Sequence, residues 1–216
     1  MIRTPPVWRR IEHVRRCLAG HRPEIVSPGE NSRAAVALVL QPQGSDLGIL
    51  LIRRAEMEGD RWSGHIAFPG GRIGVEDASP RQAAERETLE EVGLDLRGAE
   101  YLGRLDDVAG GMAAIVVSAF VYALREAPPL VPGAEVEQAF WLPMQRFLEA
   151  ERHVQRRYSY RGLEVMLPAI RVLEGEGPLL WGLTYRFLEI FLQLTGEELP
   201  PMPWRKGSSR LPKAAG

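Results

Sequence analysis

The sequence predicts a single domain of the mixed α and β sandwich class, in preference to a parallel doubly wound sheet. Stretches typical of strands surround a few helical stretches in an irregular order. The 216 residues suffice for one well-buried domain and are few for two large ones. Apolar residues at 45% and charged residues at 25% are ordinary globular proportions, which argues against disorder throughout.

Charge and cysteine content limit the binding partners and the cellular compartment that we expect for the protein. Lys and Arg number 27 and Asp and Glu number 28, so the net charge of −1 creates no overall attraction to nucleic acid or to an anionic membrane. Cys17 is the only cysteine, which excludes a disulfide within the chain and fits a reducing compartment. The N-terminal residues lack the apolar segment of a signal peptide, and no apolar run reaches the roughly eighteen residues of a membrane helix. We therefore expect a cytoplasmic protein with no nucleic-acid or membrane partner.

The first expected element is an amphipathic helix at residues 7–19, whose apolar positions recur at helical spacing. Arginines lie between these positions. They could contact nucleic acid, although a solvated charged face is the favoured interpretation. Apolar runs at 34–40 and 48–52, separated by a turn, predict a β-hairpin. A short third strand is expected at 65–68, where a Pro-Gly-Gly sequence ends it.

A second helix is expected at residues 80–92, because both of its ends are marked. Ser79 is a favourable N-cap, Pro80 suits the first helical position, and Gln82 completes a capping box. Gly93 can adopt the left-handed conformation that ends many helices. The side of this helix expected to face a core comprises Ala84, Thr88, Leu89 and Val92.

The remaining elements are mostly strands. They are expected at 100–106, 113–124 and 135–141, with a short helix at 143–150 and a further pair of strands at 154–160 and 163–173. The last pair should turn at Arg161 and Gly162. A final helix at 184–195 is expected to begin at Thr184 as its N-cap and to end at Gly196.

Three carboxylates crowd the helix at 80–92, since Glu87, Glu90 and Glu91 fall within an arc of about 100°. Like charges three or four residues apart cost a few tenths of a kcal/mol per pair, and Arg86 can offset only part of that. A cation is therefore expected beside them, and oxygen-only ligands favour Mg²⁺, Mn²⁺ or Ca²⁺. A solvated acidic face is the alternative that the helix by itself leaves open.

The stretch from Arg86 to Leu94, RETLEEVGL, resembles the second half of the Nudix box, G-x5-E-x7-R-E-U-x-E-E-x-G-U, in which U is apolar. Every fixed residue of that half is present, with Thr88 at an apolar position. In the first half, Gly71-x5-Asp77-x8-Arg86 fits if one residue is inserted and Asp replaces Glu. This variant resembles the Nudix subgroup that hydrolyses coenzyme A.

Two further stretches are similar to that subgroup. Its upstream motif, L-L-T-x-R-[SA]-x3-R-x3-G-x3-F-P-G-G, resembles residues 50–71, which keep most of its fixed residues, FPGG among them. Ile52 replaces the threonine, and Arg61 is displaced, which indicates a loop of changed length. The sequence WGLT at 181–184 resembles the one that opens the last helix of the subgroup, so the resemblance covers residues 33–196.

The resemblance implies a Nudix-type α/β/α sandwich with a mixed β-sheet, plus an N-terminal helix and a C-terminal helix. Residues 1–30 would form an N-terminal helical extension, 31–197 the Nudix hydrolase domain, and 198–216 a flexible tail. The implied reaction is hydrolysis of a nucleoside diphosphate linked to another group, X, with Mg²⁺ or Mn²⁺ as cofactor. Coenzyme A or a derivative is the expected substrate, giving adenosine 3′,5′-bisphosphate and 4′-phosphopantetheine. Whether the protein forms a homodimer is left open by the sequence.

The resemblance also implies residue roles at the matching positions. The implied metal ligands are Glu87, Glu90, Glu91 and the backbone carbonyl of Gly70. Arg86 would orient Glu87, and the cations and arginines would neutralise charge that water attack adds at phosphorus. Glu90 or Glu91 could be the general base. Glu135 is a further candidate, and its alternative role is an exposed carboxylate at a strand end.

Substrate contacts are expected from residues upstream of the glycines. The candidates are Arg53, Arg54 and Arg61, each of which could bind a phosphate through two parallel hydrogen bonds. Because neighbouring strand residues face opposite ways, only one of Arg53 and Arg54 should point into the site, and Arg54 is the preferred one. Phe68 could stack on a base or pack within the core, and Trp181 is expected in the core.

Two alternatives to coenzyme A hydrolysis stay open. The same chemistry could act on a nucleotide sugar, a dinucleotide cofactor or a dinucleoside polyphosphate, because the displaced Arg61 weakens the match to the coenzyme A motif. The other alternative is a Nudix-fold nucleotide-binding module without turnover, since a fold alone does not fix a function. Loss of the box carboxylates would have favoured that module, and all three are present.

Overall fold

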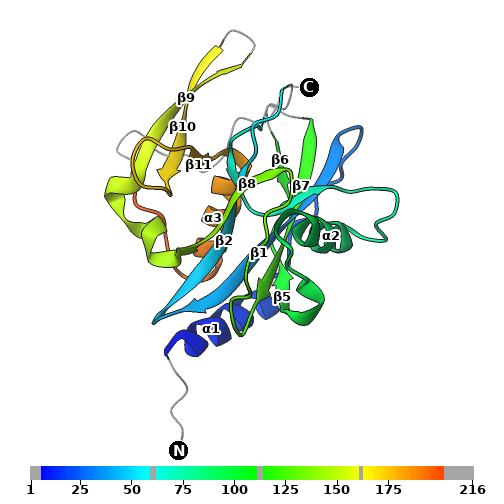
Figure 1. Cartoon of the computed structure of the whole chain (residues 1–216), viewed down its shortest axis with the longest axis vertical. Helices are drawn as coiled ribbons and strands as arrows, with labels where there is room; N and C mark the ends of the chain where they lie inside the picture. Colours follow the sequence, from blue (N-terminus) through cyan, green and yellow to red (C-terminus); the bar gives the residue numbers. More distant parts are fainter. Residues whose placement is uncertain (1–5, 59–61, 111–113, 161–162, 202–216) are drawn as a thin grey trace, which may run out of the picture.

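The computed structural model describes residues 6–58, 62–110, 114–160 and 163–201, which form two β-sheets and three helices (Figure 1). The helices are α1 (Pro6–Gly20), α2 (Pro80–Val92) and α3 (Gly182–Leu194). The strands of the larger sheet are β1 (Ser32–Gln43), β2 (Asp46–Arg54), β3 (Ile66–Ala67), β4 (Gly70–Arg72), β5 (Glu100–Arg104), β6 (Val108–Ala109), β7 (Ile115–Ala123) and β8 (Val136–Pro143). The strands of the smaller sheet are β9 (His153–Tyr160), β10 (Leu163–Arg171) and β11 (Leu179–Trp181).

The larger sheet is mixed, as the resemblance to the Nudix family implies. Its main path runs β3-β2-β1-β7-β5, and β4, β6 and β8 pair with β1, β7 and β2. Strands β1 and β7 are parallel, whereas the other pairs are antiparallel. The predicted hairpin is confirmed as β1 and β2, in which Leu40 is opposite Ile49. The antiparallel pair predicted near the C-terminus is confirmed as β9 and β10.

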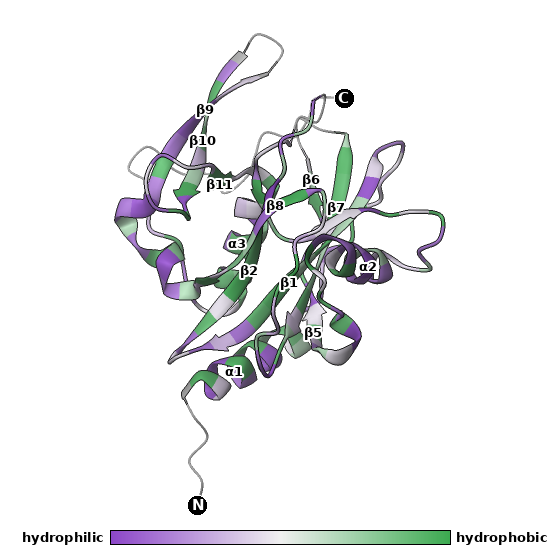
Figure 2. Cartoon of the chain, viewed as in Figure 1, coloured by the Kyte–Doolittle hydropathy of each residue, from purple (hydrophilic) through white to green (hydrophobic). Residues whose placement is uncertain are grey.

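Helices cover both faces of the larger sheet, which confirms the α/β/α sandwich. Alternate residues of β1 enter two separate cores, because successive side chains of a strand point to opposite faces. Leu38 and Leu40 pack with residues of α1 and α3, whereas Ala37 and Val39 pack with residues of α2. Figure 2 shows apolar colour along the central strands and hydrophilic colour over much of α2. The carboxylates of α2 therefore belong to a helix with one buried side.

The ends of α2 are those the sequence predicts. The Ser79 side chain accepts a hydrogen bond from the backbone N–H of Gln82 at 3.2 Å. The Gln82 side chain accepts one from the backbone of Ala78 at 2.8 Å. Gly93 has a φ of 69°, and its N–H donates to the Leu89 carbonyl at 3.0 Å. These caps fix where α2 begins and ends, and thereby which of its side chains face the sheet.

Several predicted details are wrong. Leu89, expected beside the core, is 43% exposed, and Ala83 and Glu91 are buried instead. Residues 143–150 form no α-helix, since the extended Glu149 separates the 3₁₀ turns Met144–Leu148 and Ala150–Arg152. Helix α3 begins at Gly182 and not at Thr184, because Gly182, with a φ of 66°, turns the chain directly out of β11.

Three strands were not predicted, namely β4, β6 and β11, which have three, two and three residues. The turn expected at Arg161 and Gly162 lies outside the described residues, as does most of the tail expected from residue 198. Within the described ranges, each helix is too short or too polar to cross a bilayer.

Candidate active site at β4 and the carboxylates of α2

Strand β4 brings two glycines against β1 and α2. Gly70 has a φ of 148°, and a Cβ atom there would lie 2.3 Å from the carbonyl oxygen of Ala35. A Cβ atom on Gly71 would lie 2.5 Å from both carboxylate oxygens of Glu87. Real Cβ atoms do not approach other atoms so closely, so only glycine lets β4 pair with β1 while the carboxylate sits on it. The glycines thus create the space that the acidic side chains occupy.

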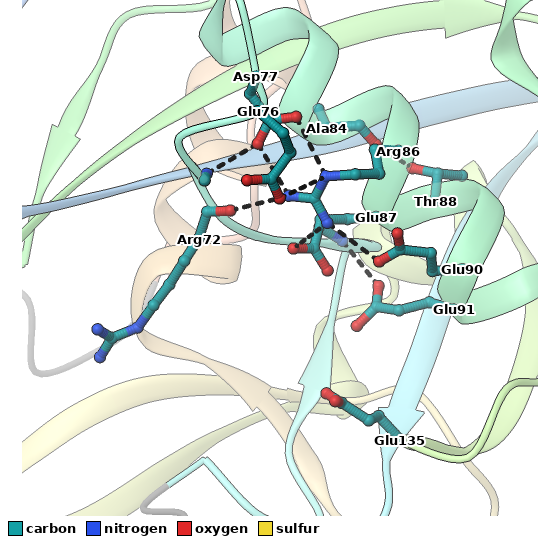
Figure 3. A network of polar contacts seen from close by, with 12 residues as sticks. Arg72, Glu76, Asp77, Ala84, Arg86, Glu87, Thr88, Glu90, Glu91 and Glu135 are labelled. Atoms are coloured by element: carbon teal, nitrogen blue, oxygen red, sulfur yellow. Dashed lines mark hydrogen bonds and ion pairs between the residues drawn. The ribbon is translucent and has the colours of Figure 1, made fainter.

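Arg86 is the centre of a polar network on α2 (Figure 3). Its guanidinium donates to both carboxylate oxygens of Asp77, at 3.1 and 2.9 Å. It also donates to Glu87 at 2.9 Å, to Glu90 at 3.0 Å and to the Arg72 carbonyl at 3.2 Å. Fork-shaped bidentate contacts of this kind fix a guanidinium in one plane. Arg86 therefore holds the carboxylates of Glu87 and Glu90 in a defined place.

Asp77 anchors that network from the loop before α2. Its side chain is 1% exposed and also accepts a hydrogen bond from the backbone N–H of Gly74 at 2.8 Å. The hydrogen bonds from Arg86 hold the pKa of the Asp77 carboxyl below its ordinary value, so this group stays charged. Asp77 was noted in the sequence motif but was not among the predicted site residues. The signal that points to it is its spacing after Gly71.

Glu91 lies deepest of the three α2 carboxylates, at 5% exposed. It accepts a hydrogen bond from the backbone N–H of Gly70 at 2.8 Å, and Arg54 Nη1 lies 3.5 Å from its other oxygen. Burial raises the pKa of Glu91 to about 8, against the lowering effects of the Gly70 N–H and Arg54, and Glu87 and Glu135 raise it further. Without a cation, the folded protein therefore favours the protonated form of Glu91 near neutral pH, and a bound cation would favour the charged form.

Glu87 shares this situation to a smaller degree. Burial raises the pKa of its carboxyl, the contact with Arg86 opposes that rise, and the charges of Glu90 and Glu135 add to it. Four carboxylates thus act on one another electrostatically around β4. Such a concentration of negative charge beside a glycine strand favours a bound cation.

Arg54 and Glu135 close the site on the side of β2 and β8. Arg54 Nη2 lies 3.8 Å from Glu135 Oε2, and the backbone N–H of Ala55 donates to the Glu135 carbonyl at 2.9 Å. The Glu135 side chain is exposed and lies across from Glu91 (Figure 3). Arg53 instead pairs with Glu137 at 2.7 Å. The structure therefore brings Arg54 and Glu135, but not Arg53, to the carboxylates of α2.

The other predicted substrate contacts have different outcomes. Phe68 is 2% exposed and packs in the core beside α1 and α3, so in this structure its ring is closed to a ligand. Trp181, expected in the core, is only partly buried and lies at the edge of the smaller sheet. Arg61 lies outside the described residues.

The donor set fits a hard divalent cation. In the part of the chain that the structure describes, no three acidic, histidine or cysteine side chains already converge on one metal position. The reason is visible in the contacts, since Arg86 holds Glu87 and Glu90 while Glu91 faces Gly70 and Arg54. The groups are nevertheless all oxygen donors, and burial raises the pKa values of two of them, the buried Glu91 and the partly buried Glu87. That chemistry suits Mg²⁺ or Mn²⁺.

Comparison with known proteins places the chain in a family. Residues 30–163 match the sequence profile described as the NUDIX domain. The chain belongs to the Nudix hydrolase family. A Nudix hydrolase from Salmonella heidelberg, NudL, described as uncharacterized, is 30% identical over 181 residues, which cover 80% of this chain and 88% of the relative. The family match includes β4, α2 and the segment that carries Glu135.

Two other relatives match shorter parts of this chain. A Caenorhabditis elegans protein named peroxisomal coenzyme A diphosphatase ndx-8 is 35% identical over 137 residues, covering 59% of this chain and 55% of the relative. A Schizosaccharomyces pombe protein, C14C4.10c, described as uncharacterized, is 42% identical over 111 residues. The matches span about a third and about half of these two proteins, at 34% and 55% of their lengths.

A solved structure supports the Nudix fold. The crystal structure of a MutT/nudix family protein from Enterococcus faecalis superposes with a TM-score of 0.51 and 19% sequence identity, and covers 86% of this chain and 69% of that one. At this identity the likeness concerns the fold alone. In the Nudix box of this chain, the segment between the acidic residue and Arg86 is one residue longer than in the usual pattern. Asp77 is the acidic residue that contacts Arg86 in this longer form.

Proposed function

We propose that this chain hydrolyses the diphosphate bond of a nucleoside diphosphate linked to another group, X. The observation that carries the proposal is the clustering of Glu87 and Glu91 against β4 with Glu135 across from Glu91, where burial and mutual repulsion raise the pKa values of Glu87 and Glu91 although Arg86 and Arg54 lie beside them. A site that attracts divalent cations beside an accessible backbone strand is suited to a diphosphate. Arg54 adds a positive charge at the same place.

The metal ligands that we propose are Glu87, Glu90, Glu91 and the carbonyl of Gly70. When bound, Mg²⁺ or Mn²⁺ would supply Lewis acidity and neutralise charge on the diphosphate oxygens. Arg86, held by Asp77, orients the carboxylate of Glu87, and its planar contacts limit the freedom of that side chain. Arg54 is placed to neutralise phosphate charge beside Glu91.

A carboxylate must also accept the proton of the attacking water. Glu135 is the candidate that the geometry favours most, since its side chain is exposed, faces Glu91 and lies next to Arg54 (Figure 3). Glu90 is the second candidate, because it is also exposed, although Arg86 holds one of its oxygens. Replacing each by glutamine and comparing kcat distinguishes the two.

Among nucleoside diphosphates linked to a group X, the substrate that we favour is coenzyme A or one of its derivatives. The upstream motif at residues 50–71 and the similarity to the protein named coenzyme A diphosphatase support it. The products would be adenosine 3′,5′-bisphosphate and 4′-phosphopantetheine. Nucleotide sugars, dinucleotide cofactors and dinucleoside polyphosphates share the same diphosphate chemistry and form the comparison panel.

The test is product identification by mass after incubation with coenzyme A and Mg²⁺ in ¹⁸O-labelled water. We expect the two named products, with one ¹⁸O atom in one of them, and no products when the metal is chelated. The position of the label identifies the attacked phosphorus. If coenzyme A stays intact while a member of the panel is cleaved, the substrate proposal is wrong and the hydrolase proposal holds. If nothing is cleaved with either metal, the hydrolase proposal is wrong.

A further inference from the structure

A second cluster of functional side chains lies on one face of the smaller sheet. Trp181 is opposite Ala169, and Ala169 is opposite Val154, so these three residues form a row on one face. Arg156 and Tyr158 follow Val154 at intervals of two and therefore share its face. The register of β9, β10 and β11 thus brings together side chains that are far apart in the sequence.

The contacts within this cluster are specific. The Arg156 guanidinium lies over the Trp181 ring, 4.3 Å from its centroid. The rings of Tyr158 and His65 each have centroids 5.1 Å from that of Trp181, and the His65 ring meets it edge to face at 70°. A guanidinium stacked on an indole is held in one plane by the ring quadrupole. Arg156 is therefore oriented before any ligand arrives.

The charge of Arg156 has no counterpart in the described part of the chain. No carboxylate there forms an ion pair with it, and its interactions are those with Trp181 and Tyr158. Burial lowers the pKa of the Arg156 guanidinium from its ordinary value, although an arginine stays protonated in proteins. Its neighbour Arg157 differs, since it is 77% exposed, faces the other side of the sheet and has Glu164 at 3.9 Å. A partly buried, unpaired cation attracts an anion.

The cluster adjoins the candidate active site through His65. The backbone N–H of Arg54 donates to the His65 carbonyl at 3.0 Å, and β11 contacts β3, which starts at the next residue. Arg54 in turn lies 3.5 Å from Glu91. Arg156 and His65 both contact the Trp181 ring. Because the cluster adjoins the strands that carry Arg54, a substrate with its diphosphate at Glu91 could place a second anionic group at Arg156.

We propose that Arg156, held on Trp181, binds a phosphate monoester of the substrate that is distinct from the diphosphate being cleaved. This inference rests on the proposed function and extends it to substrate choice. In coenzyme A that group is the 3′-phosphate of the ribose, which lies a few bonds from the diphosphate and beside the adenine. A guanidinium matches the oxygens of a phosphate monoester in paired hydrogen bonds. Arg156 is thus a specificity-determining residue, because it selects nucleotides that carry this additional phosphate.

The test compares coenzyme A with 3′-dephospho-coenzyme A, which differs only in that phosphate. We expect the wild-type protein to favour coenzyme A in kcat/KM. The variant Arg156→Gln should lower this preference about tenfold, chiefly through the KM for coenzyme A, because the lost contact is made equally before and during the reaction. Arg156→Lys keeps the charge but not the planar contact and should give an intermediate preference. Arg157→Gln is the matched control and should keep the wild-type preference.

A binding measurement separates this inference from the hydrolase proposal. Adenosine 3′,5′-bisphosphate should bind more tightly than AMP when followed by tryptophan fluorescence, and Arg156→Gln should remove most of that difference. This result supports the phosphate site even if coenzyme A is not cleaved. Equal wild-type use of the two coenzymes overturns the inference. A lower melting temperature of Arg156→Gln with an unchanged preference also overturns it, since the cluster would then only join β11 to β3.

Discussion

The carboxylates of α2 and the arginine of β9 are two charged clusters that differ in the sign of their excess charge. At α2, Arg86 and Arg54 face Glu87, Glu90, Glu91 and Glu135, so negative charge is in excess. At β9, the excess is one guanidinium held on an aromatic ring. Both excess charges are partly buried, and a buried charge is costly until an opposite charge joins it. The two clusters therefore favour ligands of opposite charge.

A substrate that meets both requirements would carry a metal-bound diphosphate at one cluster and a further phosphate at the other. The two proposed roles differ, since we propose that the α2 cluster supports the reaction and that the β9 cluster supports substrate choice. Changes at the first cluster should therefore reduce turnover for every substrate. Changes at the second should lower kcat/KM, chiefly through KM, only for substrates with the additional phosphate.

We expect the largest effect, a loss of kcat, from the variant Glu91→Gln. The amide keeps the shape of the side chain and can still accept the Gly70 N–H, but it removes the charge proposed to hold the metal. We expect kcat to fall by about a hundredfold to a thousandfold, a loss typical of removing one group that stabilises transition-state charge. Steady-state assays at saturating Mg²⁺ measure it. The exposed Glu126→Gln is the matched control and should keep wild-type kcat.

The same variant should be more stable than the wild type when metal is absent. Since burial raises the pKa of Glu91 to about 8, well above the unfolded value of about 4.3, the folded state binds the extra proton between these values. Wild-type stability should therefore fall as the pH rises through this window, and Glu91→Gln should lack that part of the loss. Urea unfolding in a chelator at about pH 5 and pH 8 checks this sign. A variant advantage that shrinks toward pH 8 would contradict it.

Gly70→Ala should destabilise the fold by about 2–4 kcal/mol, because it combines a disfavoured φ with overpacking against β1. The added Cβ would lie 2.3 Å from the Ala35 carbonyl oxygen and 2.6 Å from Val36 Cα. Urea unfolding followed by circular dichroism measures the change. Gly98→Ala is the control, since nothing lies within 4 Å of its Cβ position, and it should change stability by less than about 0.5 kcal/mol. Equal stabilities of the two variants would contradict the role given to Gly70.

Asp77→Asn should have a smaller effect on stability, about 1–3 kcal/mol, because it weakens a partly buried ion pair without changing its shape. Arg86 would keep its contacts with Glu87 and Glu90 but lose its charged anchor. We therefore expect kcat to fall about tenfold and the Mg²⁺ concentration for half-maximal rate to rise. The control is Asp95→Asn, which weakens an exposed ion pair with Arg97 and should keep the wild-type magnesium dependence. Unchanged magnesium dependence in Asp77→Asn would contradict a role of Asp77 in the proposed metal site.

The comparison of the two clusters also shows what sequence can predict. The α2 cluster depends on local signals, and the capping residues, Gly93 and the box spacing predicted the helix and its carboxylates closely. The orientation was less well predicted, since Leu89 is exposed and Glu91 is buried. The reason is β4, whose glycines leave a gap and whose N–H binds the Glu91 carboxylate, an interaction that helical periodicity does not contain.

The β9 cluster could not be predicted because it depends on pairing between distant segments. Strand β11 has three residues, and its register with β10 determines that Trp181 and Arg156 share a face. A strand this short gives little periodic signal. The sequence showed only a tryptophan before a helix and an arginine within a strand, which favoured a core tryptophan. The contact between them follows from tertiary structure.

The smallest expected effect is that of Trp181→Leu, which tests whether the ring matters to the second cluster. The leucine keeps an apolar side chain at the edge of β11 but removes the surface on which Arg156 lies. A partly exposed cation–π contact is worth about 0.5–1 kcal/mol, so the preference for coenzyme A over its 3′-dephospho form should fall about two- to fivefold. Trp181→Phe keeps a ring and should lose less. If both variants keep the full preference while Arg156→Gln abolishes it, the indole does not orient the guanidinium, and the charge of Arg156 alone accounts for the selection.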